Sequence, residues 1–126
     1  MAFKLEIKST NSTPYVLIDE EKGYFNIKGD CYSENVIDFF DSVTSWLDQF
    51  LATDFPVLTL DCELEYFNSS SSKLLYNMLS DMDACASGGK KIVVNWIYDS
   101  ANDIIIECGE DFEEELVNLE FNMVKK

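Results

Sequence analysis

The chain of 126 residues contains no histidine and no arginine, and all nine of its basic residues are lysines. Without histidine it lacks the side chain best suited to proton transfer near neutral pH, which is also the commonest transition-metal ligand. Without arginine it cannot clamp a carboxylate or phosphate with a planar, two-pronged donor. Because most enzymes that act on small molecules use at least one of these tools, the composition argues against an enzyme.

Long apolar runs are also missing. No stretch approaches the roughly 20 residues that a membrane-spanning helix needs, and residues 1–6 contain no apolar signal-peptide centre. No CxxC pair exists, so a zinc site would require remote ligands to converge. We therefore expect a soluble, cytoplasmic protein with no membrane partner, no metal, no cofactor and reduced, mostly buried thiols at Cys31, Cys62, Cys85 and Cys108.

The charge has one dominant sign. There are 24 acidic residues against 9 basic ones, which gives a net charge of −15. Such a field repels the phosphate backbone of nucleic acids, so we expect no nucleic-acid partner.

With 47% hydrophobic residues and a length typical of one domain, residues 1–126 are expected to form a single packed domain.

Strand-like and helix-like patterns alternate along the chain. Ser33 is expected to cap a first helix that runs to Leu51. Residues 68–72 begin a second helix that ends at Gly88-Gly89, and a third runs from Ala101 to Cys108 and on through Glu115. The pattern predicts an α/β fold: a mixed sheet with an N-terminal β-hairpin and helices packed against it. Six strands are expected, at residues 3–7, 15–18, 24–28, 57–66, 90–98 and 119–124.

The segment YFNSSSSK, residues 66–73, lies at a strand-to-helix junction. One serine at a helix start can be explained by capping alone, but four in a row exceed that need. A phosphate placed here would meet free backbone amides and the positive end of the helix dipole, with Lys73 adding a cation. No glycine-rich phosphate-binding loop precedes this helix. Capping and phosphorylation both remain open from the residues alone.

Two further groups have simpler explanations. The carboxylates between Asp99 and Glu115 do not follow EF-hand spacing, so we expect a solvated acidic face or a footprint for a basic partner. Trp46 and Trp96 fall on core-facing positions of a helix and a strand. Tyr98, at the strand end, is expected to be more exposed and better placed to contact a partner.

Several short motifs together are similar to one known family. The chain resembles the SiaC family of bacterial regulatory phosphoproteins over nearly its whole length, and the YFNSSSSK block is the most specific match. The family often has a basic residue where this chain has Asp30, and a proline where it has Ser33-Glu34. The other matching residues are Thr13-Pro14, Ile18-Asp19, Gly23, Gly29, Tyr32, Glu34-Asn35, Trp46-Leu47, Trp96, Tyr98 and residues 109–112.

The resemblance implies a STAS-like fold, similar to anti-sigma-factor antagonists. It also implies phosphorylation of the serine or threonine after the YFN triplet, here Ser69, by a dedicated Ser/Thr kinase, with a PP2C-type phosphatase reversing it. In the family, the unphosphorylated form binds and activates a diguanylate cyclase, which raises cyclic di-GMP.

We expect the partner surface to surround Ser69, because a helix-dipole effect of about 0.3–1 kcal/mol cannot remodel a fold that is stable by roughly 5–15 kcal/mol. Phosphorylation should then change binding to a diguanylate cyclase or other effector. Whether the chain also forms a homodimer is left open by the sequence. The alternative is a constitutive acidic module, such as a small chaperone or inhibitor of a basic partner. The residues expected on this surface are Asp30, Tyr32, Asn68, Ser70, Lys73 and Tyr98.

Overall fold

A computed structural model of the chain describes residues 3–126 and contains one six-stranded sheet in the order β1-β2-β3-β4-β5-β6. The α/β prediction, with a mixed sheet and an N-terminal hairpin, is confirmed. The strands are β1 Lys4–Ile7, β2 Tyr15–Asp19, β3 Tyr24–Cys31, β4 Val57–Phe67, β5 Lys91–Tyr98 and β6 Glu120–Lys125. The helices are the 3₁₀ turn Glu20–Lys22, α1 Val36–Phe39, α2 Asp41–Leu51, α3 Ser69–Ser87 and α4 Asp103–Glu115.

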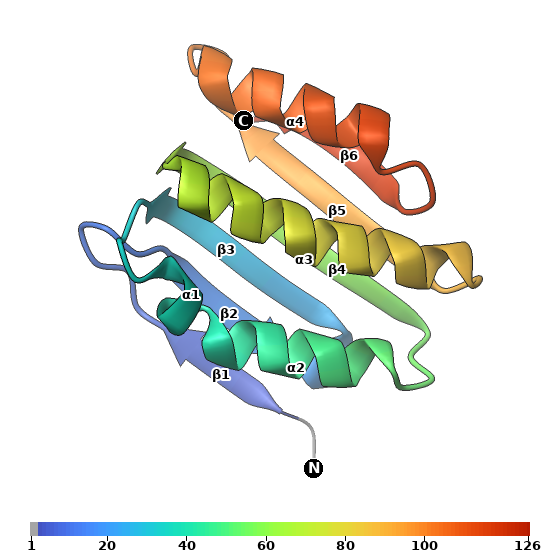
Figure 1. Ribbon diagram of the computed structural model, residues 1–126. Helices are drawn as coiled ribbons and strands as arrows, with labels where there is room; N and C mark the ends of the chain where they lie inside the picture. The colour runs from blue at the N-terminus through green and yellow to red at the C-terminus, as the bar shows by residue number, and fades with distance from the viewer. Residues whose placement is uncertain (1–2) are drawn as a thin grey trace.

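The two halves of the sheet have different directions. β1, β2 and β3 pair antiparallel, whereas β3, β4, β5 and β6 run parallel and are joined by helices. Consecutive parallel strands that are added in one direction through right-handed crossovers place every connecting helix on the same side. Figure 1 shows this result: α1, α2, α3 and α4 all lie on one face of the sheet.

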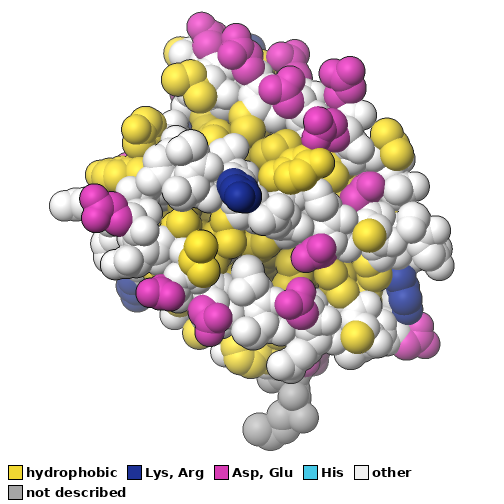
Figure 2. All heavy atoms as spheres, viewed as in Figure 1, with side chains coloured by type: hydrophobic (Ala, Val, Ile, Leu, Met, Phe, Trp, Pro, Cys, Tyr) yellow, Lys and Arg dark blue, Asp and Glu magenta, His cyan; other side chains and the backbone are white. Residues whose placement is uncertain are grey.

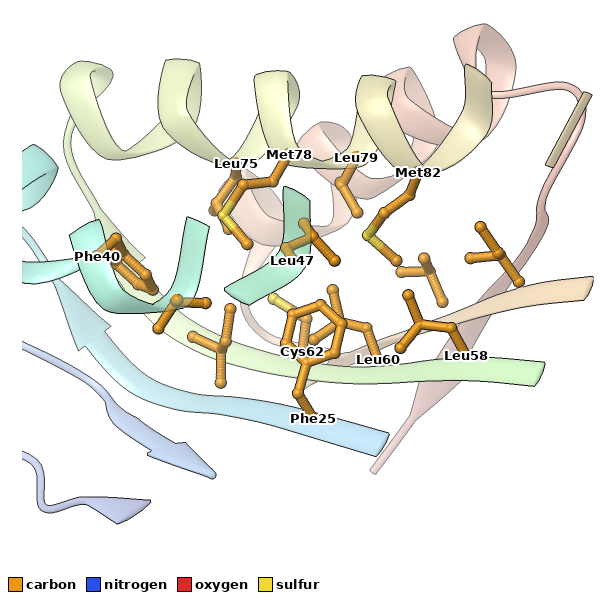
Figure 3. Close-up of a cluster of buried hydrophobic side chains, with 14 of the residues drawn as sticks. Phe25, Phe40, Leu47, Leu58, Leu60, Cys62, Leu75, Met78, Leu79 and Met82 are labelled. Carbon is orange, nitrogen blue, oxygen red and sulfur yellow. The ribbon is translucent and has the colours of Figure 1, made fainter. Parts of the chain in front are cut away.

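The core fills the space between the sheet and the helical layer (Figure 3). Alternate residues of each central strand point to the helices, and the buried stripe of α3 meets them. Trp46 and Trp96 are buried, as expected. The fully buried side chains with the largest volumes are Trp96, Phe25, Phe40, Ile18, Ile27, Leu47, Leu58, Leu60, Leu75, Leu79, Met82 and Ile92.

The opposite face of the sheet is polar. Asn26, Asp61, Asn95 and Asn122 are in register across β3 to β6 and form a side-chain row. The Asp61 carboxylate accepts hydrogen bonds of 2.8 Å from Tyr24 Oη and from Asn95 Nδ2, and Asn122 Nδ2 donates to Asn95 Oδ1 at 3.0 Å. Asp61, Asn95 and Asn122 are thus hydrogen-bonded to one another on a face that no described helix covers, whereas the buried Asn26 Oδ1 has no hydrogen-bond partner among the described residues.

The first helix differs from its prediction. Ser33 is not the N-cap: its Oγ accepts a hydrogen bond from Asn35 N at 3.1 Å, and Asn35 precedes the first helical residue. The helix also breaks at Phe40, whose backbone leaves helical geometry at ψ 2° before α2 begins. The break turns Phe40 into the core and leaves Ile37 exposed, although both lie on the apolar stripe of the sequence.

Other boundaries shift by a few residues. The third strand does not end at Gly29 but continues to Cys31, because Gly29 adopts a positive φ of 115° and the register with β4 shifts there. The last helix begins at Asp103 with Asn102 as its cap. Within residues 3–126 no helix is long and apolar enough to cross a membrane.

Candidate functional site at the start of helix α3

Asn68, not a serine, is the N-cap of α3. It has an extended backbone, with φ −93° and ψ 177°, and its Oδ1 accepts a hydrogen bond from Ser71 N at 2.9 Å. This is the standard way to satisfy a free amide in the first turn. Since Asn68 performs the capping, none of the four serines is needed for it.

The four serine hydroxyls have different surroundings. Ser71 is completely buried, and its Oγ accepts a hydrogen bond from Cys31 Sγ at 3.3 Å. Ser72 is half-buried and its hydroxyl lies beside Cys108, where burial raises the thiol pKa to about 11 while the Ser72 hydrogen bond lowers it. Ser69 and Ser70 are exposed. Only the first two serines therefore present their hydroxyls to a modifying enzyme.

Parallel strands bring the remaining groups to the same edge. Asn68 N donates to Cys31 O at 3.3 Å, which ties the end of β4 to the end of β3. Asp30 pairs with Tyr66 in the sheet, and the rings of Tyr32 and Tyr66 meet edge to face with centroids 5.3 Å apart. Thus Asp30, Tyr32 and Asn68 lie at the edge of the sheet where α3 begins with Ser69 and Ser70.

Tyr98 lies further away and is less available. It ends β5, and its carbonyl accepts a hydrogen bond from Lys126 N at 3.0 Å. Its side chain is more exposed than either tryptophan, but it is half-buried and packs against the core. Tyr98 thus borders the same edge of the sheet without lying beside Ser69.

Lys73 is exposed in the second turn of α3. The four α-helices, all within the described residues, carry twelve carboxylates and one basic residue, which is Lys73. Figure 2 shows this helical face with many acidic side chains and few basic ones. Lys73 is therefore the basic group on α3 nearest to the two exposed serines.

Three exposed apolar side chains at this edge were not anticipated. Tyr66 belongs to the YFNSSSSK block but was not assigned to the surface, and its side chain is 54% exposed. Ile37 lies on an apolar stripe that predicts burial, and Ile104 lies in the first turn of a predicted helix; neither carries a signal that marks it as exposed. In the structure they are 72% and 68% exposed.

The site has the chemistry of an acceptor rather than that of a catalyst. In residues 3–126 no three His, Cys, Asp or Glu side chains are grouped so that they could hold a metal. The carboxylates of α4 are spread along its exposed surface, and no histidine is present to activate a hydroxyl. An accessible hydroxyl at a capped helix N-terminus, with aromatic rings beside it, suits modification by another enzyme and contact with another protein.

Comparisons with solved structures agree with this description. SiaC of Pseudomonas aeruginosa matches with a TM-score of 0.90 and 31% identity over 98% of this chain and 99% of that one. A chain in the crystal structure of the diguanylate cyclase SiaD in complex with its activator SiaC, also from P. aeruginosa, matches with a TM-score of 0.91 and 33% identity, covering 97% and 99%.

Sequence comparisons give the same answer. An uncharacterized protein of P. aeruginosa (strain UCBPP-PA14) is 35% identical over 111 residues, which are 88% of each chain. Residues 7–126 match the family described as SiaC family regulatory phosphoprotein. The chain is thus a regulator rather than an enzyme, and it belongs to the SiaC family of regulatory phosphoproteins.

Proposed function

We propose that this protein activates a diguanylate cyclase and that reversible phosphorylation of Ser69 switches the activation off. The observation that carries the proposal is the exposed Ser69 hydroxyl in the first turn of α3, where Asn68 already provides the cap. The support from relatives is that SiaC of P. aeruginosa is the activator of the cyclase SiaD.

The location of Ser69 favours a switch in binding over a switch in fold. A phosphate adds about −1.5 to −2 charges at neutral pH. At the exposed N-terminus of α3 this charge interacts favourably with the helix dipole, by about 0.3–1 kcal/mol. The fold should therefore persist, and the added charge and volume act on whatever protein contacts this edge.

The partner surface that we propose includes the residues beside Ser69. Asp30, Tyr32, Asn68 and Ser70 lie at the same edge, with Lys73 one turn along α3 and Tyr98 at the border. Because Ser69 is exposed, a Ser/Thr kinase and a PP2C-type phosphatase can both reach it without unfolding the helix. The cyclase, the kinase and the phosphatase would then all bind at one edge of the molecule. This places the protein in the cytoplasm, where ATP is available to the kinase.

The proposal is tested first by mass spectrometry of protein isolated from its native host. We expect phosphate on Ser69. Phosphate confined to Ser71 or Ser72 would contradict both the assignment and the burial of those hydroxyls.

The second test compares Ser69→Ala and Ser69→Asp in binding and activation of a diguanylate cyclase, with SiaD of P. aeruginosa as the probe. We expect the alanine variant to bind and activate and the aspartate variant to do neither. Equal binding by both variants would instead favour a constitutive acidic module that needs no phosphorylation.

A further inference from the structure

Four of the eight large apolar side chains that are exposed in residues 3–126 gather at one edge of the molecule. Figure 1 shows the ends of β3 and β4 on the same side of the molecule as α1 and the N-termini of α3 and α4. Soluble monomers seldom expose apolar groups together without a binding role. We call these four residues the apolar edge: Tyr32, Ile37, Tyr66 and Ile104.

Contacts between neighbouring elements hold the apolar edge on the side of the molecule where α3 begins with Ser69. Tyr32 and Tyr66 touch at its centre, with ring centroids 5.3 Å apart, and Tyr66 is three residues before Ser69. Asn102 Nδ2 donates to Glu65 O at 2.8 Å, which ties the start of α4, the helix that carries Ile104, to β4 one residue before Tyr66. On the other side, α1 carries Ile37 and contacts α3.

Negative charge borders the apolar edge. Each of its members has a carboxylate within two residues along the chain: Asp30 and Glu34 beside Tyr32, Asp38 beside Ile37, Glu65 beside Tyr66, and Asp103 beside Ile104. Lys126 partly neutralises Glu65 at 3.7 Å, and Lys73 is the basic residue nearby on α3. A partner that fits this border must present lysines or arginines around an apolar centre.

We propose that the apolar edge is the contact surface for the cyclase of the proposed function, on which this inference rests, and that the phosphate on Ser69 acts by being desolvated there. The Tyr32–Tyr66 pair is the anchor, because tyrosine is among the residues that contribute most to binding at interface centres. The partner presents an apolar centre with a basic rim.

This geometry explains why phosphorylation releases a basic partner that simple charge attraction would retain. At the rim of an interface, an added phosphate would strengthen the attraction to lysine and arginine. Beside the tyrosine pair, binding would instead strip water from a phosphate inside an apolar contact, which disrupts an interface. The cost of desolvation then exceeds a rim attraction that water and salt screen.

The test measures binding of SiaD from P. aeruginosa to the full chain and its variants. Tyr66→Ser should weaken binding at least tenfold, whereas Tyr66→Phe keeps the ring and should weaken it less than threefold. Val117→Ser is the matched control, because Val117 is 76% exposed beyond the opposite end of α4 and should leave binding unchanged. Melting temperatures of all variants should stay close to that of the wild type, since each side chain is exposed.

A double-mutant cycle tests the release mechanism. If Ser69→Asp acts through desolvation at the tyrosine pair, it should weaken binding much less in the Tyr66→Ser background than in the wild type. Equal effects in both backgrounds would overturn this mechanism.

The outcomes separate the inference from the proposed function. If Ser69→Asp releases SiaD while Tyr66→Ser binds like the wild type, the apolar edge is refuted and the function stands. The same holds if Ser69→Asp releases SiaD while Val117→Ser weakens binding as much as Tyr66→Ser does. If Tyr66→Ser loses SiaD while Ser69→Asp retains it, the surface stands and the switch is refuted. If the wild-type chain does not bind SiaD at all, both are overturned.

Discussion

The four serines look alike in the sequence, yet the fold gives each hydroxyl a different environment. The apolar stripe of α3 includes Leu75, Met78 and Met82, and stepping back four residues from Leu75 reaches Ser71. The burial of Ser71 was therefore predictable from helical periodicity. The capping role of Asn68 was not separable from that of a neighbouring serine, because asparagine and serine are comparable N-caps and the helix boundary decides between them.

This difference predicts opposite outcomes for two phosphate-mimicking substitutions. Ser71→Asp places a carboxylate in a completely buried position beside Cys31, and we expect it to lower the free energy of unfolding by about 3 kcal/mol or more. Ser69→Asp leaves its charge in water at a helix N-terminus and should change the stability by less than about 0.5 kcal/mol. Urea unfolding followed by circular dichroism measures both.

Ser70→Asp adds the same charge to the first turn of α3 at a second exposed serine. It is therefore the control for the effect of that charge on the free energy of unfolding. A Ser71→Asp protein as stable as Ser69→Asp would show that the start of α3 is looser than the Asn68 and Cys31 contacts indicate.

At the scale of elements, the order and type of the segments follow from hydrophobic periodicity, whereas two features depend on tertiary contacts. Alternation and short apolar runs bounded by turn residues predict all six strands, but the passage of β3 through Gly29 needs the positive φ that only the paired sheet reveals. One continuous stripe predicts a single first helix. In the structure the helix breaks at Phe40, which is buried, and Ile37 remains exposed.

Two carboxylates, Asp48 on α2 and Asp81 on α3, predict that the stability of the fold depends on pH. Although Asp81 is exposed, partial desolvation by its neighbours, and then the charge of Asp48, raise the pKa of its carboxyl above the ordinary value. The folded protein therefore holds this proton more tightly than the unfolded chain does. The stabilisation that this bound proton gives is complete below the pKa that Asp81 has in the unfolded chain. It is lost as the pH rises through the pKa that Asp81 has in the folded protein, so ionised Asp81 is destabilising at pH 7.

We therefore expect Asp81→Asn to raise the melting temperature at pH 7, and the difference from wild type to vanish near about pH 3, where both side chains are neutral. Asp83→Asn is the contrasting control. The Asp83 carboxylate accepts hydrogen bonds from Asn118 N, Asn118 Nδ2 and Leu119 N, so this substitution should lower the melting temperature at pH 7. Scanning calorimetry at the two pH values gives the answer, and a lower melting temperature for Asp81→Asn at pH 7 would show that the carboxylate is stabilising.

At the scale of the whole molecule, charge is divided unevenly between the two layers. The strands carry seven carboxylates and four lysines, whereas the helices carry twelve carboxylates and Lys73. The net charge of −15 is visible in the sequence, but its concentration on one face follows only from the one-sided packing of the helices. The same packing brings the apolar edge together from four separate segments, which explains why the sequence pattern did not mark Tyr66, Ile37 and Ile104 as exposed.

This layer of like charges predicts that salt stabilises the fold. Repulsion among the carboxylates opposes the compact state, and ions screen it as the Debye length falls from about 30 Å at 0.01 M to about 8 Å at 0.15 M. We expect the melting temperature to rise between these concentrations of sodium chloride.

Neutralising Glu113, Glu114 and Glu115 together by substitution with glutamine should reduce the rise, because it removes three charges from one exposed helix end. Lys73→Gln should enlarge it, because it removes the one basic group of the helices. Sodium chloride is the proper salt, since sulfate would also strengthen apolar burial and hide the electrostatic effect. A melting temperature that stays constant or falls with added sodium chloride would show that ion pairs such as Lys90–Asp54, at 2.7 Å, contribute more to stability than the repulsion costs.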